Sequence, residues 1–383
     1  MREIVKKDRC CGCAACEQKC PKHAICMTED KNGFQYPVID QSQCVNCKKC
    51  VQVCPVSNTT ERTDDLQKCY AAQNREQQEV LESSSGGVFS LLARAVIQQG
   101  GVVVGAAFDE KFEVKHLVIE TEEELYKIRG SKYVQSNTEG IYKQVRTYLG
   151  KKRLVFFSGT PCQVNGLYGY LGGSSDLLIT TDLVCHGVPS PVVWRKYKDE
   201  RTEGDNIQKV NFREKSNGWV DFALKIDAEK AHYHKNYMQD EYMYAFMQNW
   251  SLRKSCYQCE VKGMQRKSDI TLADYWGYKG SFFLHKDLGV SMMILHTQKA
   301  VALFNEIKAD LLYEEKELNT ALSGNGVYYD SVPLPRKRAL FFTYLRRNTV
   351  SDAVHKLTDS KGIRPKIKMA AELFVIDHFK SVD

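Results

Sequence analysis

The chain has 383 residues, which is enough for two or three domains and too long for a small single-core protein. Its first residues contain no signal-peptide core, and no later run approaches the roughly 18 apolar residues of a membrane span. We therefore expect a cytoplasmic protein, in which 15 cysteines indicate metal or redox chemistry rather than disulfide bridges.

The chain opens with a cysteine motif that occurs twice. Its copies are Cys10-x2-Cys13-x2-Cys16-x3-Cys20-Pro21 and Cys44-x2-Cys47-x2-Cys50-x3-Cys54-Pro55. In such a motif three thiolates bind one 4Fe-4S cluster, and the fourth cysteine, before the proline, binds the neighbouring cluster. We therefore expect one cluster on Cys10, Cys13, Cys16 and Cys54, and a second cluster on Cys44, Cys47, Cys50 and Cys20. Zinc fits less well because its sites usually separate two Cys-x2-Cys pairs, and disulfides would need an exported protein.

The two copies resemble bacterial two-cluster ferredoxins, and the resemblance covers both binding runs. Residues 25–27 and 34–39 predict two strands joined at Asn32-Gly33, a hairpin that we expect to cover the clusters. The polar residues 58–67 predict a linker. We therefore expect a ferredoxin-like domain at residues 1–57.

The chain beyond the linker alternates predicted strands and helices. Short apolar runs predict strands at residues 69–73, 102–108, 112–119, 153–157 and 176–184. Helices are expected from residue 88 to the glycines at 100–101, from the capping box at 121–124 to Gly130, and at 138–149. The Ser- and Gly-rich stretch 82–87 ends at a helix N-terminus, whose free N–H groups favour an anion such as a phosphate. An ordinary helix cap is the other explanation of this stretch.

Two further cysteines directly follow predicted strands. Cys162 comes after the strand at 153–157, and Pro161 before it is typical of a first helical residue. Cys162 is therefore expected at a helix N-terminus, where the helix dipole favours a thiolate. Cys185 follows the strand at 176–184. Because ligands bind at the carboxyl ends of the strands in an open α/β sheet, both cysteines are expected at the binding edge.

Strands dominate the pattern after Glu203. They are predicted at residues 207–213, 219–226, 231–235, 269–274 and 290–297, with helices at 242–250, 298–312 and 369–379. His232 and His234 share one strand face, which an exposed strand explains better than a metal site. Cys256-x2-Cys259 alone is compatible with zinc, a cluster or a redox dithiol. The basic segments 336–338 and 346–347 indicate solvated surface, with an anionic cofactor or acidic partner as the alternative.

Six segments of the chain together resemble the coenzyme F420 hydrogenase/dehydrogenase beta-subunit family. They lie between residues 83 and 277 and are Ser83-Ser84-Ser85-Gly86-Gly87, Arg129-Gly130-Ser131-Lys132-Tyr133, Gly159-Thr160-Pro161-Cys162-Gln163, Cys185-His186-Gly187 with Pro189-Ser190-Pro191, Cys256-x2-Cys259, and Asp274-Tyr275-Trp276-Gly277. Members carry FAD beside a 4Fe-4S cluster and pass electrons between one-electron carriers and a two-electron substrate. The resemblance therefore implies FAD, although the sequence has no Gly-x-Gly-x-x-Gly motif. We expect flavin contacts at Ser85, Gly86, Gly87 and Lys132, and we assign no general acid or base.

The resemblance also gives a role to four cysteines outside the ferredoxin repeat. Cys162, Cys185, Cys256 and Cys259 fall in the family motifs, and our hypothesis is that they ligate a third cluster next to the flavin. The competing hypothesis makes Cys162 a redox thiol or nucleophile. Cys11, Cys26 and Cys69 are expected to be packing thiols. Because an oxidised 4Fe-4S cluster with four thiolates carries about −2, three clusters would offset most of the formal net charge of +7.

The expected fold is α+β or α/β, with the ferredoxin-like domain followed by a mixed α/β flavin-binding module in two halves, residues 68–205 and 206–383. The expected function is an oxidoreductase that relays electrons between a two-electron organic substrate, of the deazaflavin type or another, and one-electron carriers. The expected partners are a ferredoxin-type redox protein and a small-molecule hydride donor or acceptor, and not nucleic acid. The alternative is a non-catalytic electron-transfer subunit of a larger redox complex.

Overall fold

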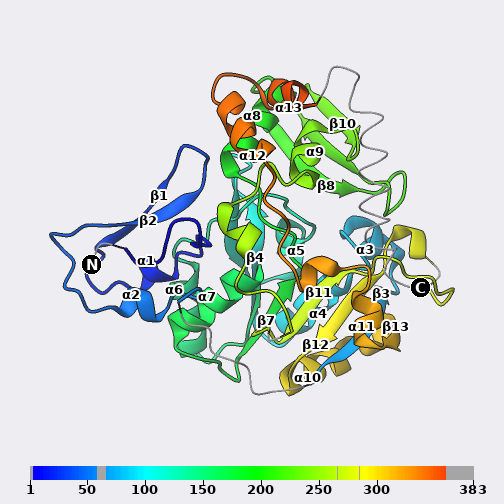
Figure 1. The fold of residues 1–383 in the computed structure, drawn as a ribbon. Coiled ribbons are helices and arrows are strands. Elements are labelled where there is room, and N and C mark those ends of the chain that lie inside the picture. The colour runs from blue at the N-terminus through cyan, green and yellow to red at the C-terminus, as the bar shows by residue number, and fades with distance from the viewer. Residues whose placement is uncertain (1–2, 58–65, 265, 284, 359–383) are drawn as a thin grey trace.

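The computed structural model of the chain describes residues 3–57, 66–264, 266–283 and 285–358 (Figure 1). Most of the predicted linker at 58–67 and the whole predicted helix at 369–379 lie outside these residues. In the part of the chain that the structure describes, no helix is both long and apolar enough to cross a lipid bilayer.

The N-terminal cysteine repeat forms a small unit at one side of the molecule (Figure 1). Each copy contributes a short helix, α1 (Ala15–Lys19) and α2 (Lys49–Gln52), which begins after a residue in the left-handed region, Ala14 or Lys48. Between the copies, β1 (Ile25–Glu29) and β2 (Gln35–Ile39) pair as the predicted antiparallel hairpin.

The hairpin does more than cover the cysteines. Its tip packs on the start of α8 (Pro191–Thr202), where Ser190 Oγ donates a hydrogen bond to the Asn32 carbonyl. A Cβ on Gly33 would lie 2.6 Å from the Val192 nitrogen, so only glycine fits at this contact. The base of the hairpin, at Ile25 and Ile39, lines the hollow that contains Cys20, Cys44, Cys47 and Cys50. The hairpin therefore docks the N-terminal unit onto the rest of the protein.

One eight-stranded mixed sheet organises the body, in the order β13-β3-β12-β11-β7-β6-β4-β5. Its strands are β3 (Lys68–Asn74), β4 (Val102–Phe108), β5 (Val114–Ile119), β6 (Val155–Ser158), β7 (Leu178–Leu183), β11 (Ile270–Asp274), β12 (Ser291–Leu295) and β13 (Leu311–Lys316). The neighbours β4, β6, β7 and β11 run parallel, and β12 is antiparallel to both β11 and β3. The carboxyl ends of β3, β4, β6, β7 and β11 therefore share one edge of the sheet.

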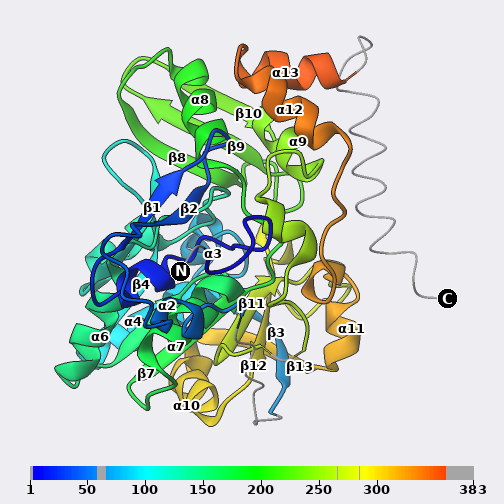
Figure 2. The same ribbon diagram turned by 60° about the vertical axis from the view of Figure 1, so that its left-hand side comes forward.

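Helices cover both faces of this sheet (Figure 2). α4 (Val88–Gln98) and α10 (Gln298–Ile307) bury apolar side chains against one face, in a core with Phe156 and Ile179. α6 (Ile141–Gly150) and α7 (Pro161–Leu171) pack on the other face, around Phe157 and Leu178. The side chains of successive strand residues alternate between the two cores, as buried parallel strands require. The short helices α3 (Gln77–Glu82), α5 (Leu125–Ile128) and α11 (Leu318–Leu322) complete the body.

A second, three-stranded sheet stands above the carboxyl edge. It has the order β10-β9-β8 and consists of β8 (Ile207–Glu214), β9 (Ala223–Ala228) and β10 (His232–Asn236). It packs with α8, α9 (Glu241–Met247), α12 (Lys337–Leu345) and α13 (Val350–Leu357) around Trp194 and Tyr242. Strands from both predicted halves of the body share the large sheet, and the boundary at 205/206 stays a prediction.

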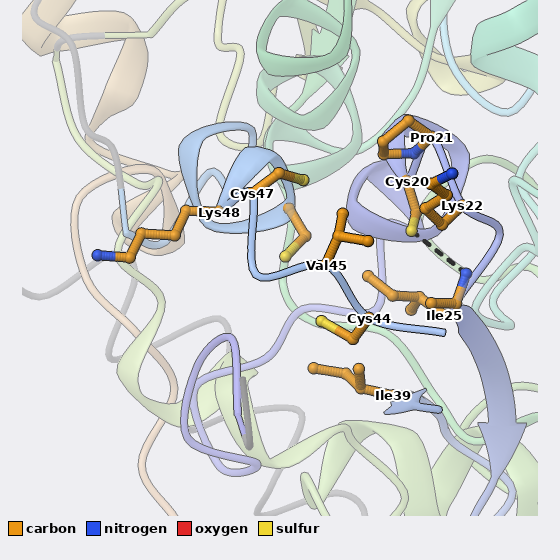
Figure 3. A pocket seen from close by; sticks show the side chains of 11 residues that line it. Cys20, Pro21, Lys22, Ile25, Ile39, Cys44, Val45, Cys47 and Lys48 are labelled. Atoms are coloured by element: carbon orange, nitrogen blue, oxygen red, sulfur yellow. Dashed lines mark hydrogen bonds between the residues drawn. The ribbon is translucent and has the colours of Figure 1, made fainter. Parts of the chain in front are cut away.

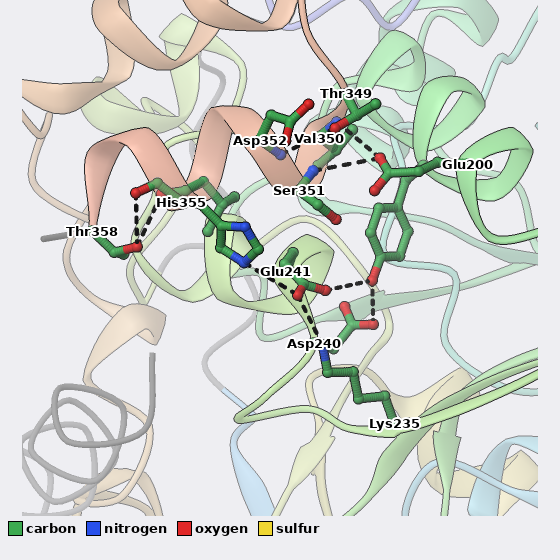
Figure 4. A network of polar contacts seen from close by, with 12 residues as sticks. Glu200, Lys235, Asp240, Glu241, Thr349, Val350, Ser351, Asp352, His355 and Thr358 are labelled. Carbon is green, nitrogen blue, oxygen red and sulfur yellow. Dashed lines mark hydrogen bonds and ion pairs between the residues drawn. The ribbon is translucent and has the colours of Figure 1, made fainter. Parts of the chain in front are cut away.

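A buried polar network ties these helices together (Figure 4). Asp240 accepts hydrogen bonds from the Tyr197 and Tyr233 hydroxyls, and Glu241 pairs with Arg201 and Lys235. Burial raises the pKa of Asp240 to about 6. Each member of the network has a partner on a neighbouring element, so the network has a structural role.

The structure corrects several expectations. Residues 311–316 form β13, an edge strand paired with β3, and not the end of the predicted helix at 298–312. Thr121 makes no side-chain cap, and the Glu124 carboxylate accepts from the Glu120 backbone N–H. Arg338, predicted to be solvated, is buried and donates to the Leu252 carbonyl. His232 and His234 lie on an exposed strand, as predicted, beside Asp227 and Glu214.

Candidate functional site

Four cysteines of the repeat line one hollow near the surface of the N-terminal unit (Figure 3). This outer set consists of Cys20, Cys44, Cys47 and Cys50, the combination that the motif assigns to a single cluster. Ile25, Ile39 and Val45 supply apolar walls to this hollow. The Ala24 N–H donates to Cys20 Sγ at 3.3 Å. A pocket with four sulfur donors and apolar walls fits a 4Fe-4S cluster.

The other four cysteines of the repeat form an inner set, which faces the body of the protein. Cys10, Cys13 and Cys54 are buried, and Cys16 is half-buried. Burial raises the pKa of Cys16, and the neighbouring Cys10 and Cys54 thiols raise it further. The Cys13 thiol likewise interacts with those of Cys16 and Cys54. The inner set therefore gathers the four thiols that the motif assigns to the other cluster.

The four cysteines of the family motifs also come together, and we call them the third set. Cys162 lies in the first turn of α7, whose cap Thr160 forms a capping box with Gln163. Cys185 follows β7, and Cys256 and Cys259 lie in and after a short 3-10 turn, Lys254–Gln258. Burial raises the pKa of Cys256, and the thiols of Cys185, Cys162 and Cys259 raise it further. Burial also raises the pKa of Cys185 to about 12.

The surroundings of the third set suit anionic ligands. The Val188 N–H donates to Cys256 Sγ at 3.5 Å, and Thr160 Oγ1 lies 3.2 Å from Cys162 Sγ. Lys262 and Arg266 are the nearby cations at Cys185. Within the described residues, no three Cys, His, Asp or Glu side chains are arranged to hold one metal ion. Ligands of a cubane surround a whole cube of iron and sulfide, so they need not converge as zinc ligands do.

Cys11 lies between the inner set and the third set. The thiols of Cys13, Cys11 and Cys162 are hydrogen-bonded in a row. The hydrogen bond to Cys11 and burial together raise the pKa of Cys162 well above its ordinary value. The raised pKa alone does not separate the ligand hypothesis for Cys162 from the redox-thiol hypothesis, and both stay predictions.

The three cysteines outside the sets differ from one another. Cys69 is buried in β3 and packs as predicted. Cys26 is exposed on β1, so its prediction as a packing thiol is wrong. Cys11 contacts Cys13 on one side and Cys162 on the other, a placement that its packing prediction missed.

Two glycines of α7 allow the N-terminal unit to approach closely. A Cβ on Gly166 would lie 2.9 Å from Cys13 Sγ, and one on Gly169 would lie 2.4 Å from the Val53 carbonyl oxygen. The same helix carries Cys162 in its first turn. α7 therefore sets the spacing between the inner set and the third set.

This packing predicts the effect of a small substitution. Gly169→Ala is expected to lower the free energy of unfolding by about 1–3 kcal/mol, because α7 and the Val53 loop must separate. The matched control is Gly150→Ala in α6, whose added Cβ would meet nothing within 4 Å. The measurement is denaturant unfolding of both variants without oxygen, followed by circular dichroism. Equal behaviour of the two variants would show that the N-terminal unit does not pack on α7.

A second group of side chains occupies the carboxyl edge beside β11, and we call it the edge site. It consists of Arg213, Trp219, Asp274 and Trp276. Buried Arg213 forms an ion pair with Asp274, with Nη1 to Oδ2 at 3.2 Å, and Trp219 Nε1 donates to Asp274 Oδ1 at 2.9 Å. The two indole rings stack in parallel with their centroids 4.7 Å apart. The edge site therefore offers flat aromatic surfaces and a buried cation in one place.

Aromatic side chains connect the third set to the edge site. His186, next to Cys185, contacts the ring of Phe246, which stacks on Tyr133 at 5.1 Å between ring centroids. The Tyr133 hydroxyl lies 3.2 Å from Arg213 Nη1. The family motif Arg129 to Tyr133 thus places Tyr133 between the two sites.

The predicted flavin contacts already have partners inside the protein. Ser85 Oγ donates to the Val290 carbonyl, and the Gly86 N–H donates to Ser291 Oγ. A Cβ on Gly86 would lie 2.5 Å from the Ala72 carbonyl oxygen, and Gly87 has a φ of +78° at the start of α4. Lys132 Nζ donates to the Arg129 carbonyl at 2.9 Å. Close packing at Gly86 and the positive φ of Gly87 explain these two glycines without a ligand. The flavin contacts at Ser85, Gly86, Gly87 and Lys132 stay predictions.

The paired cysteine sets and the fold define an iron–sulfur protein with a ferredoxin-like unit fused to a mixed α/β body. Three family models match the chain. The 4Fe-4S dicluster domain matches residues 9–58, and the coenzyme F420 hydrogenase/dehydrogenase beta subunit matches with its N-terminal part at 69–142 and its C-terminal part at 152–321. The chain belongs to the coenzyme F420 hydrogenase/dehydrogenase beta-subunit family, with a dicluster domain ahead of the family module.

Other comparisons add little to this assignment. A search of curated proteins found no match. Among solved structures, a chain of the F420-reducing [NiFe] hydrogenase complex from Methanosarcina barkeri is 14% identical, with a TM-score of 0.46. The match covers 80% of this chain and 100% of that chain.

Proposed function

We propose that the protein is an iron–sulfur flavoprotein oxidoreductase that transfers electrons between a two-electron organic substrate and one-electron carriers. Family membership supports iron–sulfur electron transfer, and the finer assignment rests mainly on one observation. The third set gathers thiols from three separate segments, between the inner set on one side and the edge site on the other. When bound, 4Fe-4S clusters exchange single electrons, and FAD accepts one or two. Clusters and FAD together therefore connect one-electron carriers to a two-electron substrate.

Several buried polar groups near α4 fit the anionic part of FAD. The hydroxyls of Ser83 and Ser90 have no partner among the described residues, and Ser90 lies in the first turn of α4. The start of α4 has no side-chain cap, so its N–H groups are available to a phosphate. Lys132 lies close by, since the Ser131 N–H donates to Ser84 Oγ. We propose that these groups hold the pyrophosphate of FAD.

The edge site fits the ring end of the same cofactor. Arg213 Nε is buried and has no partner among the described residues. Lys215 Nζ donates to the carbonyls of Val80, Ser85 and Leu288 and thereby joins this region to the 83–87 loop. We propose that Arg213 and the stacked Trp219 and Trp276 orient the flavin and its substrate and exclude water. The sequence motifs had singled out only Asp274 and Trp276 of this group.

Lys132 makes flavin binding pH-dependent in a defined direction. Burial, and to a lesser extent Arg129, lowers the pKa of Lys132 to about 7. The neighbouring His116 stays neutral at this pH, because burial lowers its pKa to about 4. An anion binds the charged amine better than the neutral one, so FAD affinity is expected to fall above pH 7, by up to about tenfold per pH unit. Fluorescence titration of FAD from pH 6 to 9 measures this, and Lys132→Met should remove most of the slope.

The outer set supports an acidic one-electron carrier as the partner. Cys47 is exposed, and the exposed residues Lys22 and Lys48 line the same hollow, with the exposed Lys49 next in the sequence. Val45, which lines the hollow, is 57% exposed. Lysines around an apolar patch favour an acidic surface of the ferredoxin type. We propose that the carrier docks at the outer set.

The alternative is a subunit that transfers electrons but turns over no substrate by itself. Anaerobic titration of the flavin-loaded protein with reduced F420, NADH and NADPH distinguishes the two hypotheses. Bleaching of the flavin absorbance by one donor supports an enzyme and names the donor. Bound flavin that none of the three reduces supports the subunit alternative. Failure to bind any flavin would contradict the proposal.

A further inference from the structure

Arg253 is a buried cation that connects the N-terminal unit to the third set. Its side chain is 0% exposed, and it lies three residues before Cys256. Its Nε donates to the Cys10 carbonyl at 2.6 Å, and its Nη2 donates to the Gln35 carbonyl at 2.9 Å. Nη1 donates to Gln135 Oε1 at 3.1 Å. The guanidinium is thus held in one position by the cluster-binding loop and the hairpin.

The partners of this charge are thiols and aromatic rings. Nη2 lies 3.7 Å from Cys10 Sγ, and the guanidinium lies 4.3 Å from the ring centroid of Tyr36. Its charge also acts on the thiols of Cys11, Cys162 and Cys256. Among the described residues, Arg253 makes no ion pair with a carboxylate. A buried cation without a carboxylate is costly unless another anion compensates it.

The local backbone is built to admit this side chain. Gly12 has a φ of +70°, and a Cβ there would lie 2.7 Å from Arg253 Nη1. Gln135 Nε2 donates to the Cys11 carbonyl, so Gln135 fixes both the loop and the guanidinium. Any larger residue at position 12 would displace the cation from the loop that carries Cys10, Cys11 and Cys13.

We propose that Arg253 is the shared counter-cation of the inner set and the third set, and that it raises the reduction potentials of the clusters bound there. The proposal rests on the proposed function, which places clusters at both sets. Reduction adds one electron, and hence one negative charge, to a cluster. A fixed cation in a low-dielectric interior stabilises the more negative state, so reduction becomes easier at both sites. Arg253 acts through the clusters as a positioning and tuning residue, and no proton or other reactant is involved.

The test is a redox titration of the anaerobic holoprotein followed by EPR. In Arg253→Met, the equilibrium constant for one-electron reduction should fall at least about tenfold at both clusters, which corresponds to about 59 mV. In Arg253→Lys, the reduction potentials should return most of the way to those of the unchanged protein. The control, Arg338→Met, removes a buried guanidinium that donates to the Leu252 carbonyl and lies over Phe342. Its potentials should shift far less than those of Arg253→Met, since the hydrogen bonds of Arg338 go to a carbonyl and not to a thiol.

Two outcomes would overturn the proposal. One is an Arg253→Met protein that keeps its iron and shows unchanged potentials. The other is a shift of equal size in Arg338→Met. If Arg253→Met fails to load iron, the same titration on Arg253→Gln decides, because glutamine keeps a donor for the Cys10 carbonyl. If the unchanged protein holds no iron at the third set, the proposed function is contradicted. The reduction potential of the inner cluster, compared between the unchanged protein and Arg253→Met, would still test the role of Arg253.

Discussion

Replacing Cys162 by serine is expected to lower the iron content of anaerobically purified protein from about twelve to about eight atoms per chain. Serine offers a hard oxygen in place of a soft thiolate, and a cubane with three remaining ligands is lost or degraded. The variant should also lose one set of EPR signals and keep those of the two ferredoxin clusters. The measurement is iron per chain together with the EPR spectrum of the reduced protein.

Two controls make this result specific. Cys26→Ser changes an exposed thiol outside all three sets and should keep the full iron content. Cys11 is hydrogen-bonded to Cys162 and is the nearest spare thiol, so the double variant Cys11→Ser and Cys162→Ser excludes replacement of one ligand by the other. Unchanged iron in the double variant would remove Cys162 from the ligands and revive its role as a redox thiol.

Arg266→Met is expected to reduce the free energy of unfolding by about 3–5 kcal/mol. Arg266 and Asp182 form a buried ion pair, with side chains 1% and 2% exposed and Nη1 to Oδ2 at 2.9 Å. Asp182 also accepts from Thr271 Oγ1 at 2.6 Å, so the pair joins β7 to β11 beneath the third set. Loss of the guanidinium would leave a buried carboxylate without its cation. Denaturant unfolding without oxygen measures the change.

The comparison for this prediction is an exposed ion pair. Lys127→Met breaks the contact of Lys127 with Glu124, whose side chains are 37% and 33% exposed. Such surface pairs contribute about 0–1 kcal/mol. If Arg266→Met lowers the free energy of unfolding no more than Lys127→Met does, the buried pair does not have the stabilising role that we expect.

The parts of the fold that sequence patterns predicted well are those set by neighbouring residues. The cysteine repeat, the hairpin at Asn32-Gly33 and the strand that becomes β4 all follow from local spacing or apolar runs. The placement of Cys162 in the first turn of α7 follows from Pro161 in the same way. The first two residues of β13 were predicted as the end of a helix, because the pairing of this strand with β3 depends on residues far away in the chain.

In the candidate site too, residues close together in the sequence were predicted well, and contacts between distant segments were not. Spacing identified the inner and outer sets, whereas only the family resemblance joined Cys162 and Cys185 to Cys256. Arg253 and Arg213 gave no signal, because an arginine in a polar stretch looks like surface until the fold buries it.

The iron and flavin content of the anaerobically prepared protein, together with its low-temperature EPR spectrum, decides whether three clusters and a flavin are bound to this chain. We expect about twelve iron atoms, no zinc and one FAD per chain, with three interacting 4Fe-4S signals after reduction. About eight iron atoms with no capacity to bind FAD, or zinc at Cys162, Cys185, Cys256 and Cys259, would contradict it.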